Sequence, residues 1–340
     1  MEDKLLQTIK YLREYGSSEN DYKSRIVLAA PAYGAQNLLR AYMNGGNIGK
    51  IALDNSEKTT GIKSKSYAHK HKGIIPDVVE VLDTESEADE ESRLAAIISD
   101  EYLSYAQAAT TTYAVKSDDT SDKERTVETM IMDFQHQKSG NAAIDMEMQY
   151  SARDHFGWTR TKKEGHVYIS EMEYRNKTWY NECLFDNSAD TKSPRVDLMI
   201  LNDDGVGFVE LKVDNENCDN LRSHINHMKY ILSHVDIFRA DAERRIAVLQ
   251  NYGLLEKEML PNLKKWNESK RIWCGILFVG NEGHLSEAKQ IIGKYKDTIG
   301  EDILCSFIGT DVVKSENLNF VSDSFVTGKV FRSEAYNGIF

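Results

Sequence analysis

The sequence has few cysteines and lacks any long apolar run, and both absences narrow the class of protein. Its four cysteines, Cys183, Cys218, Cys274 and Cys305, are widely spaced and form no Cys-x-x-Cys pair. A zinc site or a disulfide framework is therefore not expected, and a reducing compartment, the cytoplasm, is expected. Because the chain contains no run of about 18 apolar residues, we predict neither a transmembrane helix nor a membrane partner.

Several signatures of catalysis and targeting are also missing. The chain has no Gly-x-Gly-x-x-Gly loop and no phosphate-loop lysine motif, and neither a Ser-His-Asp nor a Cys-His arrangement is visible. Its first residues, Met1-Glu2-Asp3-Lys4, lack the charged-then-apolar pattern of a signal peptide, so none is expected. The net charge of −12 argues against adhesion to nucleic acid through the whole surface, but it allows a local basic groove.

The length of 340 residues suits two domains, or one core with an extension. A polar, acid-rich stretch over residues 114–123 is the best linker candidate. We therefore predict an N-terminal α/β domain over 1–115, a second domain over 123–310 and an unassigned tail over 311–340. In the first domain the patterns predict helices over 3–14, 34–43 and 92–109, and strands over 25–30, 48–53 and 78–82.

The second domain alternates between strand and helix patterns. The stripe of Val127, Met130, Ile131 and Phe134 predicts a helix, whereas residues 144–150 alternate as a strand does, although they also fit a helix. Downstream, strands are expected over 167–174, 272–279 and 303–308, and helices over 221–235, 241–266 and 285–295. This mixture predicts an α/β fold with a mixed central sheet flanked by helices.

The most informative feature lies between these elements, on two predicted strands joined by the turn Asn202-Asp203-Asp204-Gly205. Asp197 lies on the first strand. Glu210 and Lys212 share one face of the second strand with Val206 and Phe208, because side chains alternate with period two. A hairpin here brings two carboxylates and a lysine onto neighbouring backbones. Carboxylates hold hard divalent cations, and a nearby lysine can orient a water molecule.

The spelling Pro194-x-x-Asp197 with Glu210-x-Lys212 resembles the PD-(D/E)xK nuclease superfamily, and so does the order of elements over residues 123–310. The resemblance implies a restriction-endonuclease-like core and a Mg²⁺ or Mn²⁺ cofactor. It implies that Asp197, Glu210 and the main-chain carbonyl of Leu211 bind the metal and that Lys212 positions the attacking water. A surface hairpin with a solvated ion pair is the alternative.

The family often places an acidic residue on the first core helix, and Glu128 fits that place, with Glu124 one turn earlier. Glu147 takes the role if residues 141–156 are helical, and Glu171 and Glu173 are outside candidates. Glu128 and Glu147 could equally lie on a solvated helix face.

Basic and polar side chains mark two regions that could contact nucleic acid. Arg222, Asn226 and Lys229 fall on one polar helix face, and Asn226 and Tyr230 stand where some family branches carry Gln-x-x-x-Tyr. A basic segment upstream contains Lys63, Lys65, Lys70 and Lys72, and another basic stretch, Arg160-Thr161-Lys162-Lys163, is expected in a turn. Packing or solvent exposure, rather than a metal, is expected for His224, His227 and His234.

Together these patterns predict a metal-dependent endonuclease that acts on nucleic acid, with DNA favoured over RNA. By family analogy it would serve prokaryotic defence or restriction. The alternative is a non-catalytic nucleic-acid-binding or assembly module on the same fold. Assembly as a homodimer is left open.

Overall fold

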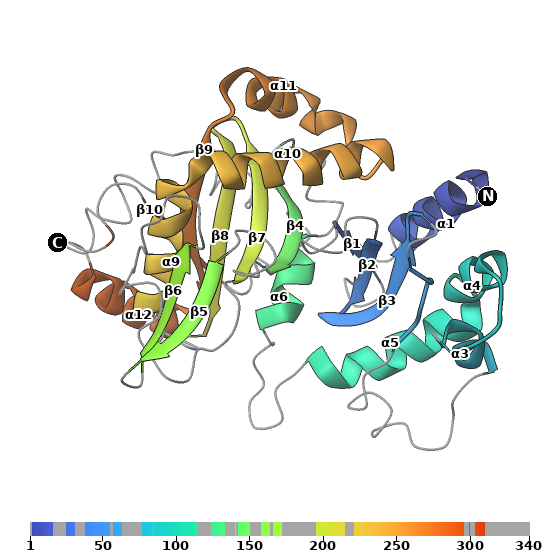
Figure 1. The fold of residues 1–340 in the computed structure, drawn as a ribbon. Helices are drawn as coiled ribbons and strands as arrows, with labels where there is room; N and C mark the ends of the chain where they lie inside the picture. Colours follow the sequence, from blue (N-terminus) through green and yellow to red (C-terminus); the bar gives the residue numbers. More distant parts are fainter. Residues whose placement is uncertain are drawn as a thin grey trace.

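The structure is a computed structural model that describes residues 2–15, 25–30, 38–54, 57–62, 77–83, 85–114, 124–132, 140, 142–149, 158–163, 166–171, 195–214, 221–295, 299 and 303–309. It is a mixed α/β arrangement (Figure 1). A five-stranded mixed sheet flanked by helices lies beside a three-stranded antiparallel sheet, and a two-stranded hairpin is formed by β5 (Trp158–Lys163) and β6 (His166–Glu171). The stretch Arg160-Thr161-Lys162-Lys163 therefore belongs to a strand, and its predicted place in a turn was wrong.

The five-stranded sheet has the order β10-β9-β8-β7-β4. Its strands are β4 (Ala142–Gln149), β7 (Arg195–Asn202), β8 (Gly205–Val213), β9 (Ile272–Gly280) and β10 (Ile303–Gly309). Strands β4, β7 and β8 are antiparallel neighbours, whereas β8, β9 and β10 run parallel. All nine positions of β8 and of β9 are buried, as expected of central strands covered on both faces.

Helices cover both faces of this sheet. On one face α6 (Glu124–Ile131) packs Val127 and Ile131 against β8 residues such as Leu211. On the other face, Phe208 of β8 packs with the apolar stripe of α9 (Leu221–Ser233) and with α10 (Val235–Asn251). Two further helices complete this layer, α11 (Leu260–Ser269), preceded by the 3₁₀ turn Lys257–Met259, and α12 (Glu282–Lys294). The helix predicted over 241–266 is thus two helices, α10 and α11.

The smaller sheet consists of β1 (Val27–Ala29), β2 (Leu38–Met43) and β3 (Gly46–Ala52). Its second strand contradicts the helix predicted over 34–43. Asn44 and Gly45 have φ angles of 50° and 76°, and Met43 pairs with Gly46 across them. Two central residues with positive φ make the hairpin turn that Asn-Gly favours, so local turn chemistry sets a strand where the apolar spacing suggested a helix.

The helices described in this N-terminal part are α1 (Glu2–Glu14), α3 (Asp77–Leu82), α4 (Glu90–Ile97) and α5 (Asp100–Ala114), and they share a buried core with the smaller sheet. The first confirms the helix predicted over 3–14, and α4 and α5 divide the one predicted over 92–109. The strand predicted over 78–82 was wrong. This β-branched run forms α3, whose Leu82 is buried in the core with Leu94 of α4, so tertiary packing overrides strand propensity there.

Contacts cross the predicted linker between the two parts. Arg13 of α1 donates to the main-chain carbonyl of Leu254 and to the carboxylate of Glu256, at 3.1 and 2.9 Å. The hydroxyl of Thr126 donates to the carbonyl of Asn44 at 3.1 Å. One cluster of buried apolar side chains includes residues of both sheets. The domain boundaries at 115 and 123 remain a prediction.

Two of the four cysteines lie within the described residues. Cys274 on β9 and Cys305 on β10 are buried free thiols, and burial raises the pKa of the Cys274 thiol. Among the described helices, none has the length and apolar character needed to cross a membrane.

Candidate functional site

The hairpin of β7 and β8 forms as the sequence predicts. Asn202 pairs with Gly205, and the Asn202 side chain closes the turn by accepting from the Asp204 main-chain N–H at 3.0 Å. Gly205 has a φ angle of 125°, and a Cβ at this position would lie 2.3 Å from the Arg271 carbonyl oxygen. Glycine is therefore required at the end of the turn, which fixes the register of both strands.

At the other end of the hairpin the two strands separate. Main-chain pairing between them ends at Leu198 and Val209, yet β7 continues back to Arg195 on β4 and β8 continues to Val213 on β9. Beyond this point, the carboxylate of Asp197 accepts from the Leu211 main-chain N–H at 2.7 Å. A side chain thus takes the place of the strand partner, and Asp197 is held against β8.

Glu210 and Lys212 lie on β8 beside Asp197, and they are almost fully buried, with 4% and 2% of their surfaces exposed. Lys212 Nζ is 2.6 Å from Glu210 Oε1 and 3.6 Å from Glu124 Oε1 of α6. Alternate residues of a strand share a face, and Glu124 in the first turn of α6 approaches the ammonium of Lys212. The structure therefore brings together the three residues of the sequence motif and one upstream glutamate.

His224 of α9 completes this charged cluster, and the sequence interpretation missed it. Its Nδ1 lies 2.6 Å from Glu210 Oε1, and its ring meets the His227 ring edge-on at a centroid distance of 5.9 Å. A signal was present, because His224 is three residues after Leu221 and four before Met228, on the apolar stripe of the helix. A polar residue on the buried stripe of a helix points toward the sheet.

The charges at the site affect its two carboxylates in opposite directions. Burial and the nearby charge of Glu210 raise the pKa of Asp197 well above its ordinary value, with Glu124 acting in the same direction. Burial alone would also raise the pKa of Glu210, but His224 and Lys212 outweigh it and hold that pKa well below the ordinary range. Burial would lower the pKa of Lys212, yet the surrounding carboxylates, Glu210 first, keep it raised.

The donor chemistry of the cluster suits a divalent cation. Three carboxylates, Asp197, Glu210 and Glu124, act on the one lysine, Lys212, so negative charge is in excess among these four side chains. Burial first, and then the charge of Glu210, raise the pKa of Asp197. A hard cation bound by carboxylate oxygens would neutralise that excess. The described residues include no group of three or more His, Cys, Asp or Glu side chains arranged to hold a metal ion, so Asp197 and Glu210 would leave most ligand positions to the main chain or water.

The remaining predicted site residues fall into two groups. Glu128 is buried, 1% exposed, one turn beyond Glu124 on the same face of α6, and Lys229 is exposed on α9. Others lie outside what is described: the side chains of Arg222, Asn226, Glu147 and Glu171, and the whole of Glu173, Lys63, Lys65, Lys70 and Lys72. Their predicted roles stay predictions.

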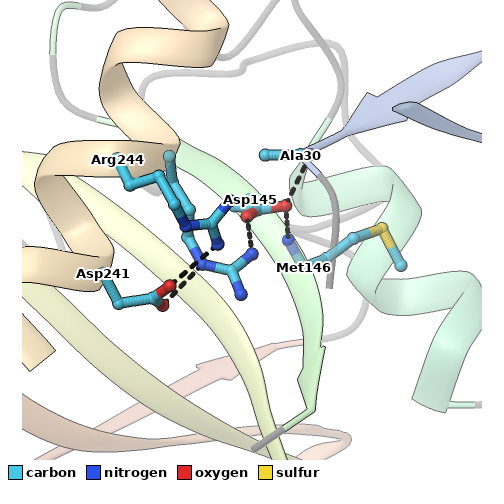
Figure 2. Close-up of polar contacts among 6 residues, drawn as sticks. Ala30, Asp145, Met146, Asp241 and Arg244 are labelled. Atoms are coloured by element: carbon cyan, nitrogen blue, oxygen red, sulfur yellow. Dashed lines mark hydrogen bonds and ion pairs between the residues drawn. The ribbon is translucent and has the colours of Figure 1, made fainter. Parts of the chain in front are cut away.

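A second charged cluster is fully buried and lies between the two sheets (Figure 2). Asp145 of β4 accepts from the main-chain N–H groups of Ala30 and Met146, each at 2.9 Å. Its other oxygen meets Arg245 of α10 at 2.5 Å, and Arg245 also binds Asp241 at 2.7 Å. Burial raises the pKa of Asp145 despite the attraction of Arg245. The cluster ties the N-terminal sheet, the edge strand and α10 together.

Comparisons of the chain with protein-family models, with curated proteins and with solved structures gave no match.

Proposed function

We propose that this protein is a metal-dependent nuclease that hydrolyses phosphodiester bonds in nucleic acid, with DNA favoured as the substrate. The observation that carries the proposal is the convergence of Asp197, Glu210 and Lys212 where β7 and β8 separate. A surface ion pair would be exposed, whereas Glu210 and Lys212 are almost fully buried. Charged groups kept out of water beside a carboxylate of raised pKa are typical of functional sites.

The arrangement of the elements also supports this proposal. Helix α6 precedes the antiparallel strands β4, β7 and β8, and α9 then leads to β9, which is parallel to β8. This order resembles the restriction-endonuclease-like core, with the aspartate and the Glu-x-Lys motif on its middle strands. A role in prokaryotic defence or restriction follows by analogy with that superfamily alone.

In this proposal each side chain has a separate role at one scissile phosphate. Asp197 and Glu210 would hold Mg²⁺ or Mn²⁺, with the Leu211 carbonyl as a further ligand, and the bound metal would polarise the phosphate and lower the pKa of a water molecule. Lys212 would orient that water. His224 and Lys212 both contact Oε1 of Glu210, and together these contacts limit the rotation of its carboxylate.

A cleavage assay tests the proposal directly. Supercoiled DNA and a structured RNA are each incubated with the wild type, Lys212→Met and Asp197→Asn, with Mg²⁺, Mn²⁺ or EDTA. We expect wild-type cleavage only with metal, and a loss of at least about a hundredfold in each variant, the usual scale for removing an acid–base or charge-stabilising group. Lys264→Met, an exposed lysine on α11, is the matched control and should cleave normally.

The alternative function predicts a different outcome. If the fold serves as a non-catalytic binding or assembly module, the wild type binds nucleic acid but leaves it intact with every metal. Absence of both binding and cleavage would reject the nucleic-acid proposal as a whole.

A further inference from the structure

A second pair of titratable side chains, Asp214 and His284, lies outside the cluster around Glu210. Asp214 is the first residue after β8, and His284 lies in the first turn of α12, which follows β9. His284 Nδ1 is 2.9 Å from Asp214 Oδ1. Because a carboxylate can only accept, Nδ1 carries the proton in this contact. The pair therefore has one defined orientation.

Three features of the backbone hold the pair in place. Asp214 has a φ angle of 49°, and its N–H donates to the Val279 carbonyl at 2.9 Å. A Cβ at Gly280 would lie 3.0 Å from the Cβ of His284 and 3.3 Å from the Asp214 carboxylate, so glycine leaves the room that they occupy. The Asn281 side chain caps α12 by accepting from the His284 N–H at 3.0 Å. The backbone after β8 and the backbone between β9 and α12 thus both hold the contact between Asp214 and His284.

The two partners differ in their access to solvent. The Asp214 side chain is 10% exposed, whereas the His284 side chain is 37% exposed. Within the described residues, no hydrogen bond or ion pair engages His284 Nε2. A partly buried carboxylate therefore orients a ring that is partly exposed to solvent. Such a ring can bind a ligand with little loss of conformational entropy on binding.

The position of the pair relates it to the candidate site. Glu210 and Lys212 lie on β8, and Asp214 follows the strand four residues beyond Glu210, so the rise of an extended chain places Asp214 at most about 13 Å from Glu210. That distance is the axial length of about four nucleotides of one DNA strand. A nucleic-acid strand that crosses the site along β8 would therefore bring a neighbouring phosphate to the His284 ring.

We propose that His284 is a positioning residue that binds a backbone phosphate a few nucleotides from the scissile bond. Its protonated ring donates from Nε2 to a phosphate oxygen, and Asp214 holds the ring and balances its charge. Contacts of this kind fix the register of nucleic acid without reading its sequence. This inference rests on the proposed function, because it takes the substrate to be nucleic acid.

The test combines binding and cleavage by the full chain. Binding of a short fluorescein-labelled DNA duplex is measured by anisotropy over a range of salt concentrations, with Ca²⁺ replacing Mg²⁺. The proteins are wild type, His284→Ala, His284→Gln and Asp214→Asn. Lys294→Gln is the matched control, because it removes a positive charge from the exposed far end of the same helix. Cleavage of the same duplex with Mg²⁺ gives KM and kcat.

We expect His284→Ala to weaken binding about tenfold, as the loss of one charge-assisted hydrogen bond does, and to reduce the salt slope by about one ion. KM should rise with little change in kcat. His284→Gln should restore part of the affinity because it keeps an N–H donor, and Lys294→Gln should bind as the wild type does.

Wild-type binding that His284→Ala leaves unchanged would overturn the role of His284 and spare the nuclease proposal. A wild type that neither binds nor cleaves would instead reject the nuclease proposal, and this inference with it. Equal weakening by Lys294→Gln would show a general charge effect and would also overturn the role of His284.

Discussion

The fold buries the carboxylate of Asp197 and places it near the carboxylates of Glu210 and Glu124. The folded state holds its pKa above the ordinary value of 3.8. The ionised form therefore destabilises the fold. This effect is absent below about pH 4 and grows as the pH rises through the folded-state pKa. At neutral pH, each unit of that pKa difference corresponds to about 1.4 kcal/mol of lost stability.

We therefore expect Asp197→Asn to be more stable than the wild type at pH 7 and equal to it at the acid end of the folded range. Asparagine keeps an oxygen that can accept from the Leu211 N–H. The measurement is urea unfolding at a series of pH values. Asp203→Asn, an exposed turn residue, is the control and should change the free energy of unfolding by less than about 0.5 kcal/mol.

Metal should reverse this order. If Asp197 is a metal ligand as proposed, Mg²⁺ should raise the midpoint of thermal unfolding of the wild type by mass action, whereas it should barely change that of Asp197→Asn. An asparagine variant that is less stable than the wild type throughout this pH range would show that burial and the neighbouring carboxylates do not disfavour the ionised form of Asp197.

Apart from its proposed role in positioning a water molecule, Lys212 should stabilise the fold, because its buried ammonium pairs with the carboxylate of Glu210. We expect Lys212→Met to destabilise the protein by about 3–5 kcal/mol, the usual effect of breaking a buried ion pair from one side. Adding Glu210→Gln should recover much of that loss without restoring cleavage. Urea unfolding of both single variants and the double variant measures the coupling. Additive effects would contradict a direct pair.

At the scale of elements, the sequence correctly predicted strands where the local pattern of residues indicated one structure clearly. The alternation of apolar residues and the Asn202–Gly205 turn located β7 and β8, and with them Asp197, Glu210 and Lys212. It failed at β2, where apolar spacing was preferred over the Asn44-Gly45 turn signal. His224 was missed because its contact depends on how α9 packs against β8, and one helix pattern read alone does not reveal that packing.

The β2–β3 turn offers a test of what its glycine contributes. Gly45→Ala forces a side chain into positive φ and brings Cβ within 2.7 Å of the Arg125 main chain. Gly253 also has a positive φ, 65°, but nothing lies within 4 Å of the place that a Cβ would occupy there. Gly253→Ala therefore measures the cost of placing alanine at positive φ without any steric clash. We expect a loss of about 1–2 kcal/mol for Gly253→Ala and a clearly larger loss for Gly45→Ala. Chemical denaturation compares them, and equal losses would show that α6 yields to the new methyl group.

At the scale of the whole molecule, the Asp145 cluster joins parts that are distant in the sequence. Asp145 and Arg245 are 100 residues apart, and Ala30 is a further 115 residues from Asp145 in the other direction. No local pattern predicts such a contact, because it exists only once β1, β4 and α10 are assembled. The Asp145 cluster is buried and contacts both the N-terminal part and the five-stranded sheet, so both depend on the same ion pairs.

Removal of Arg245 should therefore loosen both sheets together. We expect Arg245→Met to lower the free energy of unfolding by about 3–5 kcal/mol, since Asp145 stays buried without its partner. Hydrogen exchange should accelerate in β1–β3 and in β4–β10 alike. Arg244→Met, which changes the neighbouring and partly exposed arginine, should have a smaller effect. Faster exchange in only one sheet would show that the two parts unfold independently.

The two buried thiols allow the opening of the parallel part of the sheet to be measured by their chemical reactivity. Cys274 and Cys305 lie on adjacent strands, and the Cys274 thiol contacts the Met228 carbonyl of α9 at 3.7 Å. A thiol reagent can reach Cys274 only when α9 lifts away or β9 separates from its neighbours. The rate of its modification thus measures how often this layer opens in the native protein, without any introduced label.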